Sequence, residues 1–213
     1  REMGLPIAKL ICASNSNSVL TDFLTTGVYD RNREFFTTVS PSMDILISSN
    51  LERLLYSLAG SEKVKGWMKQ LAECGRYEVD ADTLAKLRSL FAAGCCNDDE
   101  TKATIAAAYK EKGYLCDTHT AVAVKVYYDY KARTGDCAPA VIASTASPFK
   151  FSTAVLEGGA EELDEFAMVA RLAEVTGLEC PEQLAGLRDK PVRFTGCCSK
   201  DKMEQTVFDM LGV

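Results

Sequence analysis

The sequence predicts an α/β fold, a three-layer and mainly parallel sheet with helices on both faces, followed by a mostly helical C-terminal part. Two observations predict it: short apolar runs alternate with longer amphipathic segments, and the connections between them are short. We expect residues 1–150 to form the α/β portion and residues 151–213 to form a helical extension packed on it. Parallel sheets bind ligands beyond the carboxyl ends of their strands, so polar segments there are candidate sites.

The first half of the chain contains one predicted strand and three predicted helices. Residues 7–13 are a compact apolar run of strand length. The helices share apolar residues at helical spacing and have either a capping residue in front or a glycine behind. They cover residues 19–26, 51–56 and 61–74. Residues 43–47 are compatible with either a strand or a helix.

In the second half, short strands are predicted at residues 77–79, 114–116 and 139–143. Helices that open with a capping residue or with acidic residues are predicted at residues 81–91, 98–112 and 118–133. Beyond Pro148 the pattern is mostly helical, over residues 151–156, 161–176, 181–187 and 200–211, with a short strand at residues 192–194.

The composition argues against several classes of protein. Of 213 residues, 47% are hydrophobic and 25% are charged, which is ordinary for a globular domain. The net charge of -6 argues against a nucleic-acid-binding protein, because phosphate contacts need a basic surface. No apolar run approaches the roughly 20 residues that span a bilayer, and no secretion signal is visible. We therefore expect a cytoplasmic protein with no nucleic-acid or membrane partner.

The nine cysteines include two adjacent pairs, Cys95 with Cys96 and Cys197 with Cys198. An odd count without C-x-x-C spacing argues against a disulfide framework or a zinc ribbon. We expect the scattered cysteines to act as small buried apolar residues in a reducing compartment. A cysteine-based redox or metal protein is a rival hypothesis, which thiol titration and elemental analysis would test.

Three polar segments follow predicted strands and are therefore candidate sites: residues 14–18, 117–120 and 144–147. The first contains Asn15 and Asn17, which could bind an anion or a cofactor edge, or could simply cap the next helix. The second contains His119, the only histidine. It could act as an acid, a base or a ligand, or could close its own helical turn.

The third segment carries hydroxyl groups and is followed by Lys150. A hydroxyl there could contact the ring nitrogen of an aromatic cofactor, and the lysine could hold a phosphate or carboxylate. The alternative is a plain turn with a solvated lysine. Elsewhere, Asn50 and Arg53 share one helical turn, and Arg53 could bind a phosphate or carboxylate through two hydrogen bonds. The alternative is an exposed or ion-paired arginine.

Together these segments resemble the threonine synthase family. The matching sequence motifs occur in the same order as in the family, at residues 4–7, 12–17, 41–45, 48–55, 117–123 and 144–151. The most specific are the asparagine loop C-A-S-N-S-N and the pair S-M-D-I and S-N-L-E-R-L-L. The resemblance covers about residues 1–155 and fades beyond them.

The resemblance implies a fold-type II pyridoxal-phosphate enzyme, related to the tryptophan synthase β subunit. Such an enzyme is a lyase that converts O-phosphohomoserine and water to threonine and phosphate, with the cofactor as electron sink. The family pattern makes Thr145 the candidate for the contact with the pyridine nitrogen. It also implies six substrate-site candidates near the cleft, namely Asn15, Asn17, Asn50, Arg53, His119 and Lys150.

The family's cofactor lysine lies in an S-F-K-D-like motif and its cofactor phosphate in a Gly-Asn-rich loop, and neither occurs in this sequence. Residues 1–3 resemble the last turn of the helix that follows that loop, with Gly4 as its stop; the alternative is a processed terminus or the remnant of a tag. We therefore expect a C-terminal fragment that is inactive alone and forms a homodimer through its truncated face. The alternative is a non-catalytic binding or interaction module derived from the same fold.

Overall fold

The computed structural model describes residues 1, 3–156 and 163–212. The chain divides into two compact units, Arg1–Cys180 and Pro181–Val213. The predicted boundary at residue 150 falls inside the first unit, in the short 3-10 helix η2 (Pro148–Phe151). None of the helices in these described ranges combines the length and the apolar character that crossing a membrane requires.

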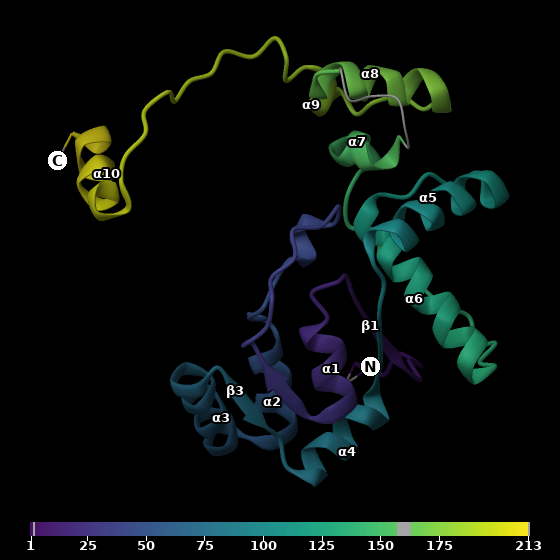
Figure 1. The fold of residues 1–213 in the computed structure, drawn as a ribbon, viewed down its shortest axis with the longest axis vertical. Coiled ribbons are helices and arrows are strands. Elements are labelled where there is room, and N and C mark those ends of the chain that lie inside the picture. Colours follow the sequence, from purple (N-terminus) through teal and green to yellow (C-terminus); the bar gives the residue numbers. More distant parts are fainter. Residues whose placement is uncertain (2, 157–162, 213) are drawn as a thin grey trace. The chain divides into compact units, whose positions relative to one another are not determined.

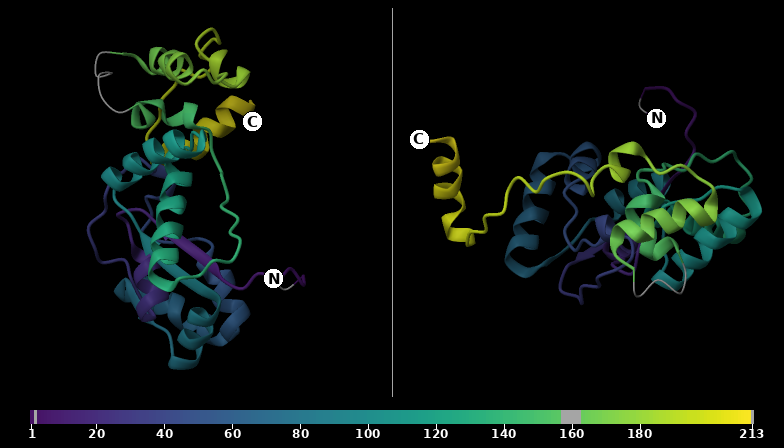
Figure 2. Two further views of the ribbon diagram at one scale, coloured as in Figure 1. Left: turned by 90° about the vertical axis from the view of Figure 1, so that its right-hand side faces the viewer. Right: turned by 90° about the horizontal axis from the view of Figure 1, so that it is seen from above.

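A parallel pair of strands lies at the centre of the first unit. Strand β1 (Leu10–Ser14) pairs with β4 (Phe91–Cys95), so that the carboxyl-terminal residues of the two strands, Ser14 and Cys95, lie opposite each other. Helices α1 (Val19–Thr26) and α6 (Thr118–Thr134) both pack against this pair (Figures 1 and 2). The predicted α/β class is therefore confirmed, with two parallel strands among the described residues.

An antiparallel pair of strands contributes two stacked tyrosines to the hydrophobic core. Strand β2 (Val28–Asp30) pairs with β3 (Arg76–Glu78). The rings of Tyr29 and Tyr77 stack at 5.2 Å, and Phe23 meets each of them edge-on at 5.7 Å. Such aromatic pairs stabilise a core beyond the area that they bury. The helices that contribute to this core are α1, α2 (Leu51–Ala59), α3 (Ser61–Cys74) and α4 (Ala81–Leu90).

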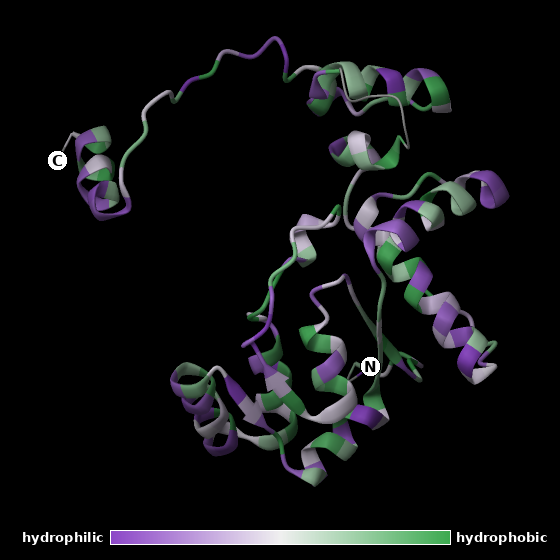
Figure 3. Cartoon of the chain, viewed as in Figure 1, coloured by the Kyte–Doolittle hydropathy of each residue, from purple (hydrophilic) through white to green (hydrophobic). Residues whose placement is uncertain are grey.

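Capping residues determine where several helices begin. Asp80 caps α4, and Asn97 with Glu100 forms a capping box at the start of α5 (Asp98–Lys112). Helix α5 packs against α6, whose C-terminal end is hydrophilic (Figure 3). The remaining elements are η1 (Pro41–Met43), α7 (Ser152–Val155) and α8 (Glu165–Thr176) in the first unit, and α9 (Glu182–Ala185), η3 (Lys200–Lys202) and α10 (Met203–Leu211) in the second.

Several predicted strands are irregular in the structure. Residues 114–116, 139–143 and 192–194 form no strand, and Val141 is 99% exposed. A strand requires a neighbour for its backbone N–H and C=O groups, and no described segment pairs with residues 139–143. Residues 43–47 are neither strand nor regular helix beyond the end of η1. The start of the helix predicted at residues 161–176 lies outside the described residues; the rest corresponds to α8.

Two strands were missed, β2 and β4. Strand β4 follows α4 without a break, and its sequence F-A-A-G-C is rich in small residues. The small residues have a packing reason, because a Cβ atom on Gly94 would lie 2.9 Å from Cγ1 of Val126. Gly94 thus permits the close approach of α6 to β4, a cause that a single-sequence pattern does not reveal.

Candidate functional site

The loop after β1 is fixed by two buried asparagines. The Nδ2 atom of Asn15 lies within hydrogen-bond distance of Thr38 Oγ1 at 2.8 Å, Ser40 Oγ at 3.1 Å and Asp44 Oδ1 at 2.7 Å. Its Oδ1 atom accepts from the backbone N–H of Asn17 at 2.9 Å. Asn15 is 1% exposed, so its amide is occupied within the protein.

The second asparagine holds the irregular stretch that leads into η1. Asn17 Nδ2 donates to the carbonyl of Phe36 at 2.8 Å, and Asn17 Oδ1 accepts from the N–H of Phe36 at 3.0 Å. The amide group therefore forms a closed pair of hydrogen bonds with one backbone residue. Both asparagines position the loop of residues 36–44. They do not cap the next helix, since Ser18 is the N-cap residue of α1 and no side chain among the described residues makes a capping hydrogen bond there.

Asp44 joins the two asparagines and was missed as a site residue. Its Oδ1 atom accepts from Asn15, from Asn17 at 3.1 Å and from Thr38 Oγ1 at 2.7 Å. Its Oδ2 atom accepts from the N–H of Thr38 at 3.0 Å. An acidic residue in an irregular segment is usually solvated, so residue type alone does not select Asp44. The signal was its place in the S-M-D-I word.

His119 connects the start of α6 to η1. Its Nε2 atom accepts a hydrogen bond from the backbone N–H of Ser42 at 3.1 Å. Because a backbone N–H can only donate, this assigns the ring proton to Nδ1, which lies 3.1 Å from Asp117 Oδ1. The ring also meets Phe151 edge-on, with centroids 4.8 Å apart. His119 is 8% exposed, and both ring nitrogens are occupied within the protein.

Asp117 ties the second polar segment to the third. Its carboxylate caps α6 by accepting from the N–H groups of His119 at 2.9 Å and Thr120 at 3.3 Å, and it also accepts from the Thr120 hydroxyl. That hydroxyl lies 3.2 Å from Ser144 Oγ, which is also 3.0 Å from the hydroxyl of Tyr114. The irregular segment before Ser144 is thus anchored to the beginning of α6.

The structure therefore brings the three predicted polar segments together. A continuous series of contacts runs from Asn15 through the loop of residues 38–44 to His119, and from there through Thr120 to Ser144. The series starts at the carboxyl end of β1, where a parallel sheet is expected to place a ligand site. We call it the polar edge.

Thr145 and Lys150 lie next to the polar edge and are exposed. Within the described residues, neither the Thr145 hydroxyl nor the Lys150 ammonium group makes a hydrogen bond or an ion pair. Thr145 directly follows the anchored Ser144, so its backbone position is constrained while its hydroxyl is available to a ligand. Lys150 is held through its backbone N–H, which donates to the carbonyl of Ser147 at 3.1 Å.

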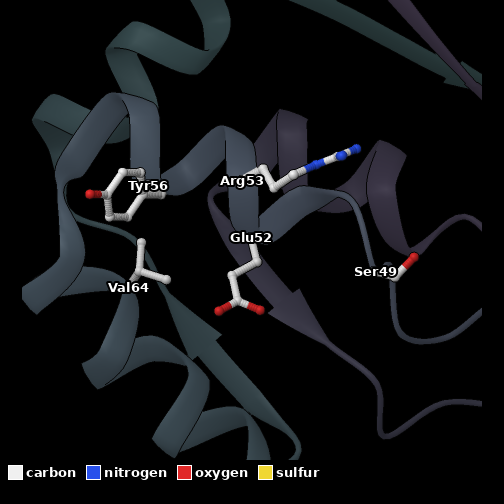
Figure 4. Close-up of a pocket in the computed structure, with 5 residues that line it drawn as sticks. All are labelled: Ser49, Glu52, Arg53, Tyr56 and Val64. Carbon is white, nitrogen blue, oxygen red and sulfur yellow. The ribbon is translucent and has the colours of Figure 1, made fainter.

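Asn50 and Arg53 form a separate site at the start of α2. Arg53 Nη2 donates to Asn50 Oδ1 at 2.7 Å. A shallow pocket of about 290 Å³ lies here and is lined by Ser49, Glu52, Arg53, Tyr56 and Val64 (Figure 4). Among the described residues, no hydrogen bond or ring contact joins Asn50 or Arg53 to the polar edge.

Three cysteines close to the polar edge are poor nucleophiles. Burial raises the pKa of the Cys12 thiol in β1 and, as the largest of several causes, that of Cys96 directly after β4. Burial likewise raises the pKa of Cys116, beside Asp117, to about 11. Because the thiolate is the reactive form, these groups stay protonated near neutral pH and act as packing residues.

Comparisons with known proteins agree on one family. Residues 120–207 match the family model described as "Threonine synthase, C-terminal". Threonine synthase-like 1 of Mus musculus is 45% identical over 167 residues, which cover 76% of this chain and 22% of that protein.

Two solved structures resemble the fold. The crystal structure of threonine synthase from yeast gives a TM-score of 0.83 at 31% identity, covering 99% of this chain and 43% of that one. The structure of PLP-bound threonine synthase from Brucella melitensis gives a TM-score of 0.74 at 37% identity, covering 91% and 38%. The chain spans about a fifth to two fifths of the length of these relatives. The predicted resemblance is confirmed, and the chain belongs to the threonine synthase family.

Proposed function

We propose that this chain is the C-terminal part of a pyridoxal-phosphate-dependent threonine synthase, which converts O-phosphohomoserine and water to threonine and phosphate. The observation that carries this proposal is the similarity to a PLP-bound threonine synthase over 91% of the chain. A location in the cytoplasm, where amino-acid biosynthesis takes place in many cells, is part of the same proposal.

Thr145 and Lys150, which lie next to the polar edge, fit the cofactor better than the buried residues of the polar edge itself. When bound, pyridoxal phosphate supplies an electron-withdrawing pyridine ring. The exposed hydroxyl of Thr145 has no partner among the described residues and is a suitable neutral contact for the ring nitrogen. Asn15 and Asn17 are buried and already hydrogen-bonded, so we assign them to holding the loop rather than the cofactor. Lys150 supplies an exposed cation close by.

The catalytic lysine is proposed to lie outside these residues. Neither an S-F-K-D-like motif nor a Gly-Asn-rich phosphate loop occurs in the sequence. The 213 residues alone should therefore neither bind the cofactor covalently nor release phosphate from O-phosphohomoserine. Treatment of this chain with pyridoxal phosphate and borohydride, followed by peptide mass spectrometry, tests this. A specific lysine adduct within the chain would contradict it.

The function itself is tested in a protein that contains this chain together with the lysine motif. We expect phosphate release from O-phosphohomoserine with pyridoxal phosphate present. Thr145→Val should lower kcat by about 10-fold or more, because the ring contact is lost, while Thr145→Ser should stay within a few-fold. Thr153→Val, at an exposed threonine of α7, is the matched control. Absence of phosphate release in the loaded wild-type protein would overturn the function, leaving the non-catalytic binding module.

We also propose that the isolated chain self-associates. Several large apolar side chains are exposed in the first unit, among them Val141 at 99%, Leu5 at 61% and Ile47 at 52%. Self-association would remove apolar side chains of this kind from water. Light scattering of the chain at high concentration should show a dimer, and a clean monomer would contradict the proposal.

A further inference from the structure

We infer that the pocket at the start of α2 binds a phosphate-type oxyanion through the guanidinium group of Arg53, which Asn50 holds in place. If the proposed function is correct, this anion is the phosphate group of the substrate. Only that identification of the anion rests on the proposed function. The binding of an oxyanion follows from the charges, hydrogen bonds and shape of the pocket.

Arg53 is a cation without an acidic partner. Basic residues on neighbouring elements are paired: Lys63 with Asp80 at 2.9 Å and Arg76 with Glu78 at 3.6 Å. Within the described residues no carboxylate lies within ion-pair distance of Arg53. Its positive charge is therefore uncompensated and available to an anion that enters from solvent.

Asn50 orients this cation without neutralising it. Asn50 is the N-cap residue of α2, but its side chain makes no capping hydrogen bond. Its Oδ1 atom instead accepts from Arg53 Nη2 at 2.7 Å. A guanidinium group has five N–H donors, so one bond to a neutral amide leaves the others free for oxygen atoms of a ligand. The start of the helix adds a weak positive potential.

Glu52, the one acidic side chain that lines the pocket, does not pair with Arg53. Figure 4 shows that the Glu52 carboxylate and the Arg53 guanidinium leave α2 in different directions. The charge of Glu52 acts on Tyr77 in β3, where it helps, after burial and Tyr29, to raise the pKa of the phenol. The Arg53 side of the pocket therefore remains electropositive.

The pocket favours a phosphate over a solvated small ion. Its volume is about 290 Å³, and its lining adds the hydroxyl of Ser49 and the apolar surfaces of Tyr56 and Val64. Planar guanidinium groups recognise two oxygen atoms of a phosphate or carboxylate at once. Figure 4 shows the Arg53 guanidinium extending away from Tyr56 and Val64, so the phosphate contact itself rests on Arg53.

The test is a titration of the protein with three ligands, followed by the backbone amide NMR signals of residues 49–53. We expect saturable shifts with inorganic phosphate, tighter binding of O-phosphohomoserine, and much weaker binding of homoserine, which has a carboxylate but no phosphate. If homoserine bound as tightly as O-phosphohomoserine, the site would recognise a carboxylate, and the assignment to phosphate would be wrong. An absence of saturable shifts with both phosphate compounds would overturn the inference.

Two substitutions of Arg53 test whether its side chain supplies the affinity for inorganic phosphate. Arg53→Gln should weaken binding of inorganic phosphate by about 10-fold or more, and Arg53→Lys by less, because lysine keeps the charge but not the paired donors. Arg76→Gln removes a guanidinium group that is already paired with Glu78 and is the matched control. Equal phosphate affinity of Arg53→Gln and Arg76→Gln would contradict the role of Arg53.

Asn50→Asp gives a test that does not depend on fold damage. Aspartate is as good an N-cap residue as asparagine, so thermal stability should be kept. The new carboxylate would pair with Arg53, and phosphate affinity should fall by about 10-fold or more. Wild-type affinity in this variant would overturn the inference.

Phosphate binding without threonine formation would refute the proposed function alone, and threonine formation that Arg53→Gln leaves unchanged would refute this inference alone.

Discussion

His119 accepts a hydrogen bond from the backbone N–H of Ser42 at 3.1 Å, across 77 positions of sequence. This bond fixes η1 to the beginning of α6. Because Asp117 is bonded to the other ring nitrogen, the imidazole holds η1 at a fixed distance from the start of α6. The same ring packs on Phe151, so the start of the C-terminal helical part depends on it too.

His119→Ala should lower the free energy of unfolding by about 2–3 kcal/mol, since it removes a buried ring and leaves the Ser42 N–H without its acceptor. His119→Gln should recover part of the loss, because a glutamine oxygen can accept near the position of Nε2. Urea denaturation measures both. Tyr128→Ala, at a half-exposed position of the same helix, is the control. An equal effect of His119→Ala and Tyr128→Ala would show that His119 does not hold the two segments.

Asp44→Asn should be strongly destabilising although it is nearly isosteric. Four donors, from Asn15, Asn17 and Thr38, point at the carboxylate, and an amide NH2 group would face some of them. The expected loss is about 2–3 kcal/mol, the cost of unsatisfied groups around a charged acceptor. Asp82→Asn changes an exposed ion pair and should cost less than about 1 kcal/mol. Similar midpoints for the two variants in urea would contradict the central role of Asp44.

Gly94→Ala should destabilise the protein by about 1–3 kcal/mol, because its Cβ would overpack against the stiff side chain of Val126. The loss of stability caused by Gly94→Ala should be smaller in the Val126→Ala variant than in the wild type, because the side chain that the new Cβ would press against is then truncated. Gly66→Ala is a control of opposite sign: it lies within α3 and its Cβ would meet no atom within 4 Å. It should stabilise by about 0.5–1 kcal/mol through helix propensity. Thermal unfolding distinguishes these outcomes, and a neutral Gly94→Ala would refute the close contact.

The sequence predicted those features that depend on neighbours along the chain. Helices α4, α5 and α6 were placed correctly because Asp80, Asn97 and Asp117 cap them locally. The polar segments were selected because they follow apolar runs. Contacts between distant segments, such as Asn17 with Phe36 or His119 with Ser42, depend on how loops pack and leave no periodic signal. The strand predicted at residues 139–143 has the right composition, but strand formation also requires a neighbouring strand.

The same difference between local sequence and distant contacts applies to the site residues. The sequence identified His119, Asn15 and Asn17 by type, but their buried contacts show that they position loops. It could not distinguish them from Thr145, whose hydroxyl is exposed. Burial, which separates a structural polar group from one available to a ligand, is a property of the fold rather than of the local sequence.

Asp80 should contribute stability that depends on pH. A hydrogen bond from Lys63, and then one from the backbone N–H of Thr83, lower the pKa of Asp80 from 3.8 to about 2. A carboxyl group whose pKa is lower in the folded state stabilises above the unfolded pKa and loses this effect as pH falls through the folded pKa. Its side chain is 39% exposed, so solvent screening limits the effect to about 1 kcal/mol or less.

The matched variant for this effect is Asp80→Asn, which keeps an N-cap residue and removes the charge. Its free energy of unfolding should fall below that of the wild type at pH 7, and the difference should shrink between pH 3.8 and about pH 2. Urea denaturation across this range measures it. A difference that is constant with pH would mean that the lowered pKa contributes nothing to folding.

Tyr77→Phe should leave the protein equally stable or make it more stable by up to about 1 kcal/mol, because the Tyr77 hydroxyl is buried without a hydrogen-bond partner in the described residues. Tyr29→Phe is the matched control, since its ring stacks on Tyr77 at 5.2 Å while its hydroxyl donates to the carbonyl of Leu46 at 3.0 Å and accepts from the N–H of Ser48 at 2.9 Å. Removal of that hydroxyl leaves two backbone groups unpaired and should cost about 1–3 kcal/mol. Differential scanning calorimetry should thus separate two chemically identical changes in neighbouring rings. If Tyr77→Phe is the more damaging of the two, the Tyr77 hydroxyl has a bonding partner, such as a buried water.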